Sequence, residues 1–318
     1  KILWQKSLHK DHPHEAGHYT ASLASNSPVT DGERIVASFG SRGVYCLDLE
    51  GKLLWKKDLG EMHSKHGHGE GSSPVLHGDV VVINWDHEEQ SFIVALDKRT
   101  GQQKWRVARP EDTSWATPIV VEHKGRAQIV VSGTNRIRSY DPATGGVNWE
   151  CGGLSSNIVA SPVSADGIVF AGSSYDTRNL LAIRLDGAKG DITGTDQVLW
   201  SRRRGCPYVP SPLLYDGFLY TLQHYQGVIF RIDSKNGEEQ GGPFRLAAVT
   251  EVYSSPVGAA GRIYVTSRAG ITQVLSNDAE GKSLATNRLD DSISASAAIA
   301  GSELYLRGEK HLYCIAEK

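Results

Sequence analysis

The sequence has few cysteines, no long apolar segment and no strong excess of charge. Its four cysteines are Cys46, Cys151, Cys206 and Cys314, and none forms a Cys-x-x-Cys pair. That spacing excludes the usual zinc and redox motifs and a disulfide scaffold, although it leaves open whether Cys151 and Cys206 pair. No apolar run approaches the roughly 20 residues that span a bilayer. The formal net charge of −2 offers no basic stripe for nucleic acid.

Several catalytic signatures are also missing. The chain contains no Gly-x-Ser-x-Gly nucleophile elbow, no Gly-x-Gly-x-x-Gly and no Gly-rich phosphate-binding loop. Helix-capping patterns followed by helical apolar spacing are essentially absent as well. The sequence therefore predicts an all-β chain without these common catalytic or nucleotide sites.

What the chain does contain is a long internal repeat. Ser-Pro or a close variant opens seven units, at Ser27, Ser73, Thr117, Ser161, Ser211, Ser255 and Ser296. The shortest step, from residue 255 to 296, is 41 residues, and the longest, from 161 to 211, is 50. Periods of this length are typical of the four-stranded blades of a β-propeller.

Each unit reads as four short strands joined by turns. Asp31-Gly32, His77-Gly78 and their equivalents supply the first turn, where glycine tolerates a positive φ. The segments that follow, such as Ile35–Ser38 and Val80–Ile83, are rich in β-branched residues and predict the second strands.

The last unit, residues 296–318, ends after its third predicted strand. The first residues, Lys1–Leu8, match the fourth-strand segment Lys52–Leu59. We therefore predict a single domain, residues 1–318, in which residues 1–8 complete the last blade and close a seven-bladed propeller. Closure would remove exposed strand edges. A leader removed before Lys1 is compatible with the sequence.

One motif carries a family resemblance. Ala95–Trp105 reads Ala-x-Asp-x-x-Thr-Gly-x-x-x-Trp, Ser139–Trp149 follows it closely, and Cys46–Trp55 is one residue shorter. This motif resembles the tryptophan-docking repeat of pyrroloquinoline-quinone-type propellers. These include quinoprotein alcohol dehydrogenases and the propeller lipoprotein of outer-membrane assembly, as well as poorly characterised bacterial propellers, many of them exported.

The resemblance implies a periplasmic or extracellular protein whose tryptophans fill the gaps between blades. Two features depart from the family pattern. Those propellers usually have eight blades, and their cofactor-binding dehydrogenases commonly carry two adjacent cysteines, which this chain lacks. The second departure argues against pyrroloquinoline quinone as a cofactor.

The loops before each Ser-Pro and those between second and third strands should emerge on one face. Propellers usually bind ligands there, at the mouth of the central channel. Arginines in these loops would attract anions, and aromatic and amide side chains would stack or hydrogen-bond. The predicted ligand-binding residues are Arg42, Trp115, Arg136, Asn157, Arg178, Arg204, Tyr208, Tyr253, Arg268 and Arg307. The alternative is local ion pairing and ordinary packing at the rim.

Two neighbouring loops, residues 9–26 and 60–72, are rich in histidine. Imidazole and carboxylate at this density suit zinc or another transition metal, and we expect His66, His68 and Glu70 as its ligands. The alternative is a set of solvated histidines. His14–His18 formally matches His-Glu-x-x-His, but Gly17 disfavours the helix which that motif needs, so we interpret the match as chance.

Three functions remain open at this stage. The first is a binding or scaffold module, monomeric, for a protein or a small anionic or glycan ligand. The second is a metal-assisted enzyme acting on an anionic or sugar substrate, with the histidine-rich edge providing metal ligands or acid and base groups. The third is a quinone-dependent oxidoreductase. The sequence names neither the partner nor the metal, and it leaves catalysis undecided.

Overall fold

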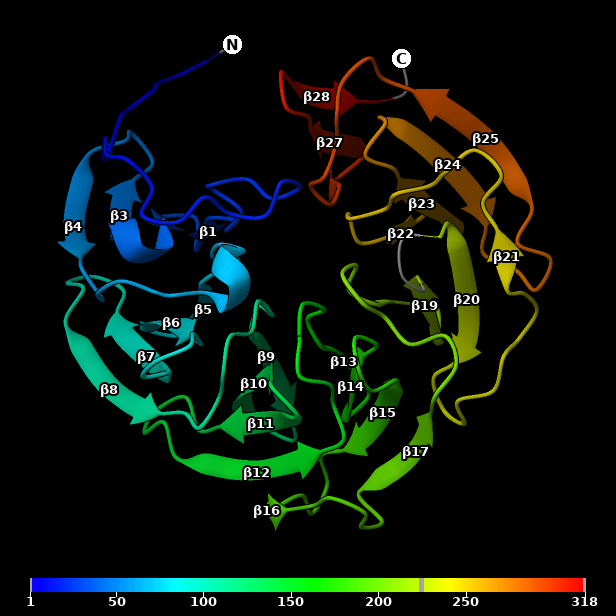
Figure 1. Cartoon of the computed structure of the whole chain (residues 1–318), viewed down its shortest axis with the longest axis horizontal. Helices are drawn as coiled ribbons and strands as arrows, with labels where there is room; N and C mark the ends of the chain where they lie inside the picture. Colours follow the sequence, from blue (N-terminus) through cyan, green and yellow to red (C-terminus); the bar gives the residue numbers. More distant parts are fainter. Residues whose placement is uncertain (1, 223–225, 317–318) are drawn as a thin grey trace. The chain divides into compact units, whose positions relative to one another are not determined.

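The computed structural model describes residues 2–222 and 226–316 and is an all-β, seven-bladed propeller built from antiparallel blades (Figure 1). The chain divides into two compact units. Unit 1 comprises Lys1–Gly152, Ser156–Ile158 and Ala188–Thr193, and unit 2 comprises Gly153–Ser155, Val159–Gly187 and Gly194–Lys318. Within the described residues, the helical structure consists of two short 3-10 turns, and no helix is long and apolar enough to cross a membrane.

Unit 1 holds three sheets, each formed by consecutive antiparallel strands. The first contains β1 (Val29–Thr30), β2 (Arg34–Ser38), β3 (Val44–Asp48) and β4 (Leu53–Lys57). The second contains β5 (Val75–His77), β6 (Val80–Trp85), β7 (Phe92–Asp97) and β8 (Gln103–Ala108). The third contains β9 (Ile119–His123), β10 (Arg126–Gly133), β11 (Arg136–Tyr140) and β12 (Val147–Gly152). A fifth strand, β16 (Gly190–Asp191), pairs in parallel with β12.

Unit 2 holds the other four sheets. They contain β13 (Val163–Ala165), β14 (Ile168–Ser173), β15 (Asn179–Arg184) and β17 (Val198–Arg202); β18 (Leu213–Tyr215), β19 (Phe218–Leu222), β20 (Val228–Asp233) and β21 (Phe244–Arg245); β22 (Val257–Ala259), β23 (Arg262–Thr266), β24 (Ile271–Ser276) and β25 (Ser283–Arg288); and β26 (Ala298–Ala300), β27 (Glu303–Arg307) and β28 (Leu312–Ile315). The predicted repeat is thus confirmed, strand by strand, within both units.

The repeated Ser-Pro positions connect successive blades. In unit 1 the backbone N–H of Ser27 donates to Oγ of Ser73, at 2.9 Å, and that of Ser73 donates to Oγ1 of Thr117, at 3.1 Å. The same bond recurs in unit 2, where the donors and acceptors are Ser161 to Ser211, Ser211 to Ser255, and Ser255 to Ser296. A small hydroxyl side chain at five of the seven blade starts, Ser73, Thr117, Ser211, Ser255 and Ser296, therefore satisfies a backbone donor of the preceding blade.

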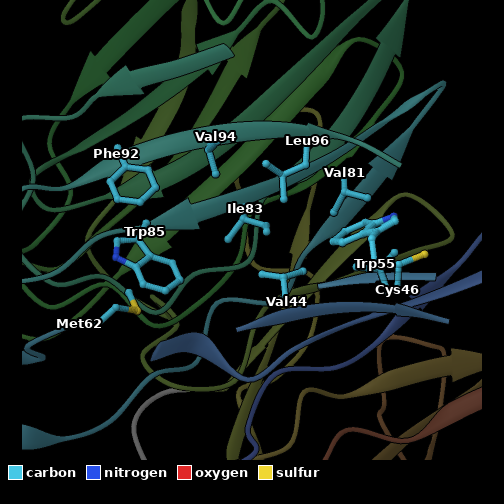
Figure 2. Close-up of a cluster of buried hydrophobic side chains, with 11 residues drawn as sticks. Val44, Cys46, Trp55, Met62, Val81, Ile83, Trp85, Phe92, Val94 and Leu96 are labelled. Carbon is cyan, nitrogen blue, oxygen red and sulfur yellow. The ribbon is translucent and has the colours of Figure 1, made fainter. Parts of the chain in front are cut away.

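The hydrophobic cores lie between neighbouring sheets. In unit 1, Trp55 on β4 and Cys46 on β3 pack with Val81 and Leu96 of the second sheet (Figure 2). At the other end of this cluster Met62 lies beside Trp85, whose ring stacks on Phe92. Burying aromatic and aliphatic side chains of this size contributes about 1.5–3 kcal/mol each.

The outer-strand tryptophans fill the gaps between blades as the motif predicts. The indole N–H of Trp55 donates to the carbonyl of Lys98 at 3.0 Å, and that of Trp200 donates to Ser234 at 3.0 Å. The glycine of the facing turn, Gly101 or Gly237, lies against the ring, where a methyl group would be 2.7 Å from ring carbons. Trp149 differs, because its indole donates to Gln128 of its own sheet.

One fold prediction requires correction. The strand predicted at residues 1–8 is absent from the described residues 2–8, and the sheet β26–β28 has three strands among the described residues. Instead, the Trp4 indole donates to the Leu49 carbonyl at 2.7 Å and lies against Gly51 of the first sheet, as Trp55 does on the second. This contact anchors the segment through its side chain and leaves its backbone without a ladder. Ile2 and Leu3 remain 77% and 85% exposed.

Candidate functional site

The two histidine-rich loops of unit 1 meet through hydrogen bonds. The backbone N–H of His18 donates to the carbonyl of His68 at 3.0 Å, and Nε2 of His14 lies 2.7 Å from the carbonyl of Met62. Because a carbonyl only accepts, His14 carries a proton on Nε2, and the neutral ring keeps Nδ1 as an acceptor. The N-terminal loop is therefore held against the loop of residues 60–72.

Three ligand-type side chains converge where these loops meet. One nitrogen or oxygen from each of His14, Glu15 and His63 lies within 4.8 Å of the other two. The rings of His14 and His63 meet edge to face, with centroids 5.9 Å apart. Nδ1 of His63 lies 3.8 Å from Oε1 of Glu15, and its Nε2 lies 3.8 Å from Oε1 of Glu89.

The Glu15 carboxylate is fixed by the opposite loop. It accepts hydrogen bonds from the backbone N–H of Ser64 at 3.0 Å and from the Ser64 hydroxyl at 2.5 Å. The same hydroxyl oxygen accepts from the backbone N–H of Gly69 at 2.8 Å. Each carboxylate oxygen retains further acceptor capacity after these bonds.

Glu70 lies beside this cluster but is directed elsewhere. Its carboxylate accepts hydrogen bonds from the backbone N–H of Ser41, at 2.8 Å, and from the Ser41 hydroxyl. Burial raises the pKa of Glu70, and His14 Nε2 lies 3.9 Å away. Gly40 permits this arrangement, because a methyl group there would collide with the Glu70 carboxylate.

The predicted metal ligands occupy different surroundings. The rings of His66 and His68 lie 5.4 Å apart, and His68 also contacts His18 and Trp115, at 4.8 and 6.3 Å. Burial lowers the pKa of His68. Because Glu70 turns toward Ser41, the structure does not gather the three predicted ligands into one cluster.

Residues of two further loops hold the loop of residues 60–72 in place through hydrogen bonds. Nδ1 of His87 accepts a 3.3 Å hydrogen bond from the backbone N–H of His63, and His87 itself is buried. Glu88 accepts from the hydroxyl and the backbone N–H of Thr113, whose hydroxyl oxygen accepts from the backbone N–H of Lys65 at 2.9 Å. The turn at residues 65–67 therefore rests on the loop between β6 and β7.

Sequence reasoning missed a fully buried ion pair in unit 1. Nε and Nη2 of Arg109 donate to the two oxygens of Asp86 at 2.6 and 3.0 Å, and both side chains are 0% exposed. Arg109 also donates to the Tyr140 hydroxyl, while the Ser114 hydroxyl donates to Asp86. Ser114 directly precedes Trp115, so this network fixes the base of the histidine-rich loops.

A cavity of about 440 Å³ opens beside the His14–Glu15 segment within unit 1. Its lining residues come from three stretches of the chain, 6–26, 38–42 and 69–70, and include both apolar and charged side chains. Apolar walls come from Leu8, Pro13, Leu23 and Phe39, and charged walls come from Asp11, Glu15, Arg42 and Glu70. Volumes of this order are typical of pockets for small or peptide-sized ligands.

The predicted mouth residues of unit 1 have local partners. Arg42 pairs with Asp11 and Glu61, each at 3.2 Å, and lines the cavity. Arg136 pairs with Glu150 and, at 2.9 Å, with Asp191. Trp115 donates its indole proton to the carbonyl of Gly69 at 2.7 Å, and Asn157 is buried.

In unit 2 the predicted residues form two aromatic contacts. Tyr208 stacks on Tyr175 at 6.0 Å, and Arg268 lies 6.0 Å above the Tyr253 ring. Arg204 approaches Glu239 at 3.5 Å and lies over Phe230. The two remaining predicted residues, Arg178 and Arg307, are exposed.

The four cysteines are free thiols, and three of them are buried. Burial raises the pKa of Cys46 and of Cys151 to about 11 and that of Cys206 to about 12. These three thiols stay protonated at neutral pH, so they have little nucleophilic or metal-binding character. Cys314 is exposed in β28.

Comparison with known proteins assigns the repeat to a family. Residues 1–241 and 89–318 match the family described as outer membrane protein assembly factor BamB. The chain belongs to the BamB family. Together the two matches cover the whole chain, and the predicted pyrroloquinoline-quinone-like repeat is confirmed.

Two solved structures share the fold of this chain. BamB from Moraxella catarrhalis aligns with a TM-score of 0.69, over 91% of this chain and 84% of that one, at 15% identity. A europium-containing methanol dehydrogenase aligns with a TM-score of 0.65, over 88% of this chain and 72% of that one, at 11% identity. These identities support the shared fold alone.

Part of the chain is also similar to the ER membrane protein complex subunit 1 of Xenopus laevis, with 34% identity over 95 residues. That stretch is 30% of this chain and only 9% of the relative, so the likeness covers a small part of the longer protein.

Proposed function

We propose that this BamB-family chain is a binding module that holds a segment of a partner protein in the unit 1 cavity. The observation that carries the proposal is the cavity of about 440 Å³ beside the His14–Glu15 segment. An extended segment of protein presents backbone polar groups and alternating side chains, and the mixed apolar and charged lining suits both.

The organisation of the loops supports binding rather than covalent catalysis. The cavity walls are held by hydrogen bonds from Ser41 and Ser64, so little ordering is needed when a ligand enters. The buried thiols of Cys46, Cys151 and Cys206 are protonated at neutral pH. The family description, an outer-membrane assembly factor, favours a periplasmic location, and we propose that location here.

We propose that the predicted mouth residues of each unit provide further contacts for a larger partner. In unit 2, the Tyr175–Tyr208 stack and the Tyr253–Arg268 pair offer flat faces for side chains of such a partner. In unit 1, Arg42 already forms ion pairs with Asp11 and Glu61. It would therefore act as a hydrogen-bond donor at the cavity wall rather than as a free cation.

A peptide selection tests the cavity directly. A phage-displayed library of random peptides is panned on the immobilised full chain, and the affinity of selected peptides is measured for two variants. Leu23→Glu places a charge in the cavity wall, whereas Leu312→Glu places one on the last sheet; the native leucines are similarly exposed, at 67% and 69%. We expect Leu23→Glu to weaken binding at least tenfold and Leu312→Glu to leave it unchanged.

Two results would contradict the proposal. One is a failure to enrich any peptide, or peptides that bind Leu23→Glu as tightly as the native chain. The other is stoichiometric binding of pyrroloquinoline quinone, followed by absorbance, which would move the protein to the oxidoreductase hypothesis.

A further inference from the structure

The sequence His14–His18 has the letters of a helical zinc motif but not its conformation. Residues 14–18 form no helix, and Gly17 has a φ of +74°. His18 is not part of the cluster with His14, and its Nδ1 is hydrogen-bonded at 2.7 Å to the Thr20 hydroxyl. In place of His18, the fold brings His63 of the second loop to His14 and Glu15.

We propose that His14, Glu15 and His63 bind one first-row transition-metal ion, with Zn²⁺ as the best match. Two imidazoles and one carboxylate form a protein ligand set that zinc accepts, with a fourth position for water. The site goes beyond the proposed peptide binding and does not depend on it.

The geometry needs only a small closure. Around a tetrahedral zinc ion with bonds of about 2.0–2.1 Å, neighbouring ligand atoms lie about 3.3 Å apart. The three candidate ligand atoms lie within 4.8 Å of one another. Rotation of exposed side chains supplies a movement of this size, because His63 is half exposed and lies on a surface loop.

The surroundings orient the ligands in the way that metal sites require. Metal-bound histidines commonly donate the other ring N–H to a carbonyl or a carboxylate. Nε2 of His14 donates to the Met62 carbonyl at 2.7 Å, and the two nitrogens of His63 face the carboxylates of Glu15 and Glu89. Ser64 holds the Glu15 carboxylate through two hydrogen bonds.

A bound ion would have a structural consequence for the cavity. His14 and Glu15 come from the N-terminal loop, which lines the cavity, while His63 comes from the loop after β4, so the ion would cross-link these two loops of unit 1. Since metal binding to a folded site adds its binding energy to stability, zinc should raise the unfolding temperature. Water would complete the coordination of the ion at the fourth position.

The test uses the full chain without a histidine tag, stripped with a chelator. Zinc is titrated calorimetrically, and Co²⁺ is added separately to report coordination by its visible absorption. We expect one ion per chain and a zinc-dependent rise in unfolding temperature. The variants His14→Ala and His63→Ala should weaken binding by roughly a hundredfold or more.

The matched control is the double variant His66→Ala, His68→Ala, which removes two neighbouring histidines outside the cluster. It should retain stoichiometric zinc. Glu15→Gln keeps the carbonyl oxygen that accepts from Ser64 and removes the charge, so it should alter the Co²⁺ spectrum even if an alanine variant fails to fold. The proposal is overturned if no stoichiometric binding occurs, if Glu15→Gln leaves the spectrum unchanged, or if binding depends on His66 and His68 instead.

Discussion

The indole N–H of Trp105 donates a 2.9 Å hydrogen bond to the carbonyl oxygen of Pro142, and Gly145 of the same turn lies against the ring. Both halves of the repeated motif are explained by this contact. The tryptophan ends one blade, and the Thr-Gly turn of the next blade supplies the flat surface on which its ring lies.

Substitution of Gly145 by alanine should therefore destabilise the chain by about 2–4 kcal/mol, through a clash with the ring and the cost of a positive φ. A methyl group would lie 2.7 Å from Trp105 Cε3, at a φ of +74°. Gly125→Ala is the control, because its φ is +73° but no atom lies within 4 Å. Urea unfolding measures both, and equal losses would show that the ring contact is unimportant.

Removal of one partner of the buried Asp86–Arg109 pair should cost about 3–5 kcal/mol, because a desolvated charge remains. The single variants Asp86→Leu and Arg109→Met test this by denaturant unfolding. The double variant Asp86→Leu, Arg109→Met removes both charges, and we expect it to be less destabilised than either single variant. A loss in the double variant equal to the sum of the two single losses would contradict the strong coupling inferred here.

Ionisation of Asp97 should make the free energy of unfolding depend on pH at acidic pH. The hydrogen bond from Lys104, at 3.0 Å, and those from the turn lower the pKa of Asp97 to about 2. A depressed carboxyl pKa stabilises the folded state above the unfolded pKa of about 4, and the contribution is lost as the pH falls toward 2. Asp97→Asn should therefore be less stable than the native chain at pH 7, and the difference should disappear as the pH falls below 2.

The equivalent aspartate of the next repeat is a control for Asp97. Asp141 accepts the same turn hydrogen bonds, from Ala143 and Thr144, but Asn148 stands where the other repeat has Lys104. In urea unfolding at pH 7, Asp141→Asn should cost less stability than Asp97→Asn, because no lysine partner is lost. Equal losses in the two variants would refute a role for the lysine.

Thiol labelling should separate the cysteines by burial. At pH 8 the native chain should react with iodoacetamide at Cys314 alone, since the pKa of Cys46, Cys151 and Cys206 is raised to about 11 or 12. Mass spectrometry after digestion identifies the modified residues. All four should label in denaturant, and rapid native labelling of a buried cysteine would contradict the burial described here.

The strands could be predicted because the repeats share one local pattern, a glycine turn followed by a segment rich in β-branched residues. Ile35–Ser38 and Val80–Ile83 fall within β2 and β6, and Gly32 and Gly78 have the positive φ expected of their turns. The fifth strand of the third sheet, β16, could not be predicted, because only two residues pair and the parallel partner lies some 40 residues earlier in the chain.

The histidine-rich loops could be located from composition, but their contacts could not. His14 and His63 are 49 positions apart, and no periodicity relates them, so the loop conformations alone decide which histidines meet. Asp86 and Arg109 lie in ordinary loop sequence, and only the fold reveals that both are buried. The predicted strand at residues 1–8 was based on the sequence match with residues 52–59. In the structure, residues 2–8 form no strand, and what the match reflects is the contact of Trp4 with the first sheet.

The serine hydroxyls at the blade starts constrain how this chain could have grown. In unit 2, Ser211 and Ser255 each accept from the preceding blade and donate, through the backbone, to the following one. A duplication or deletion that begins and ends at a Ser-Pro dipeptide leaves every such amide with an acceptor. A change by part of a repeat would leave an amide without its hydroxyl acceptor. These bonds therefore favour changes in blade number by whole repeats.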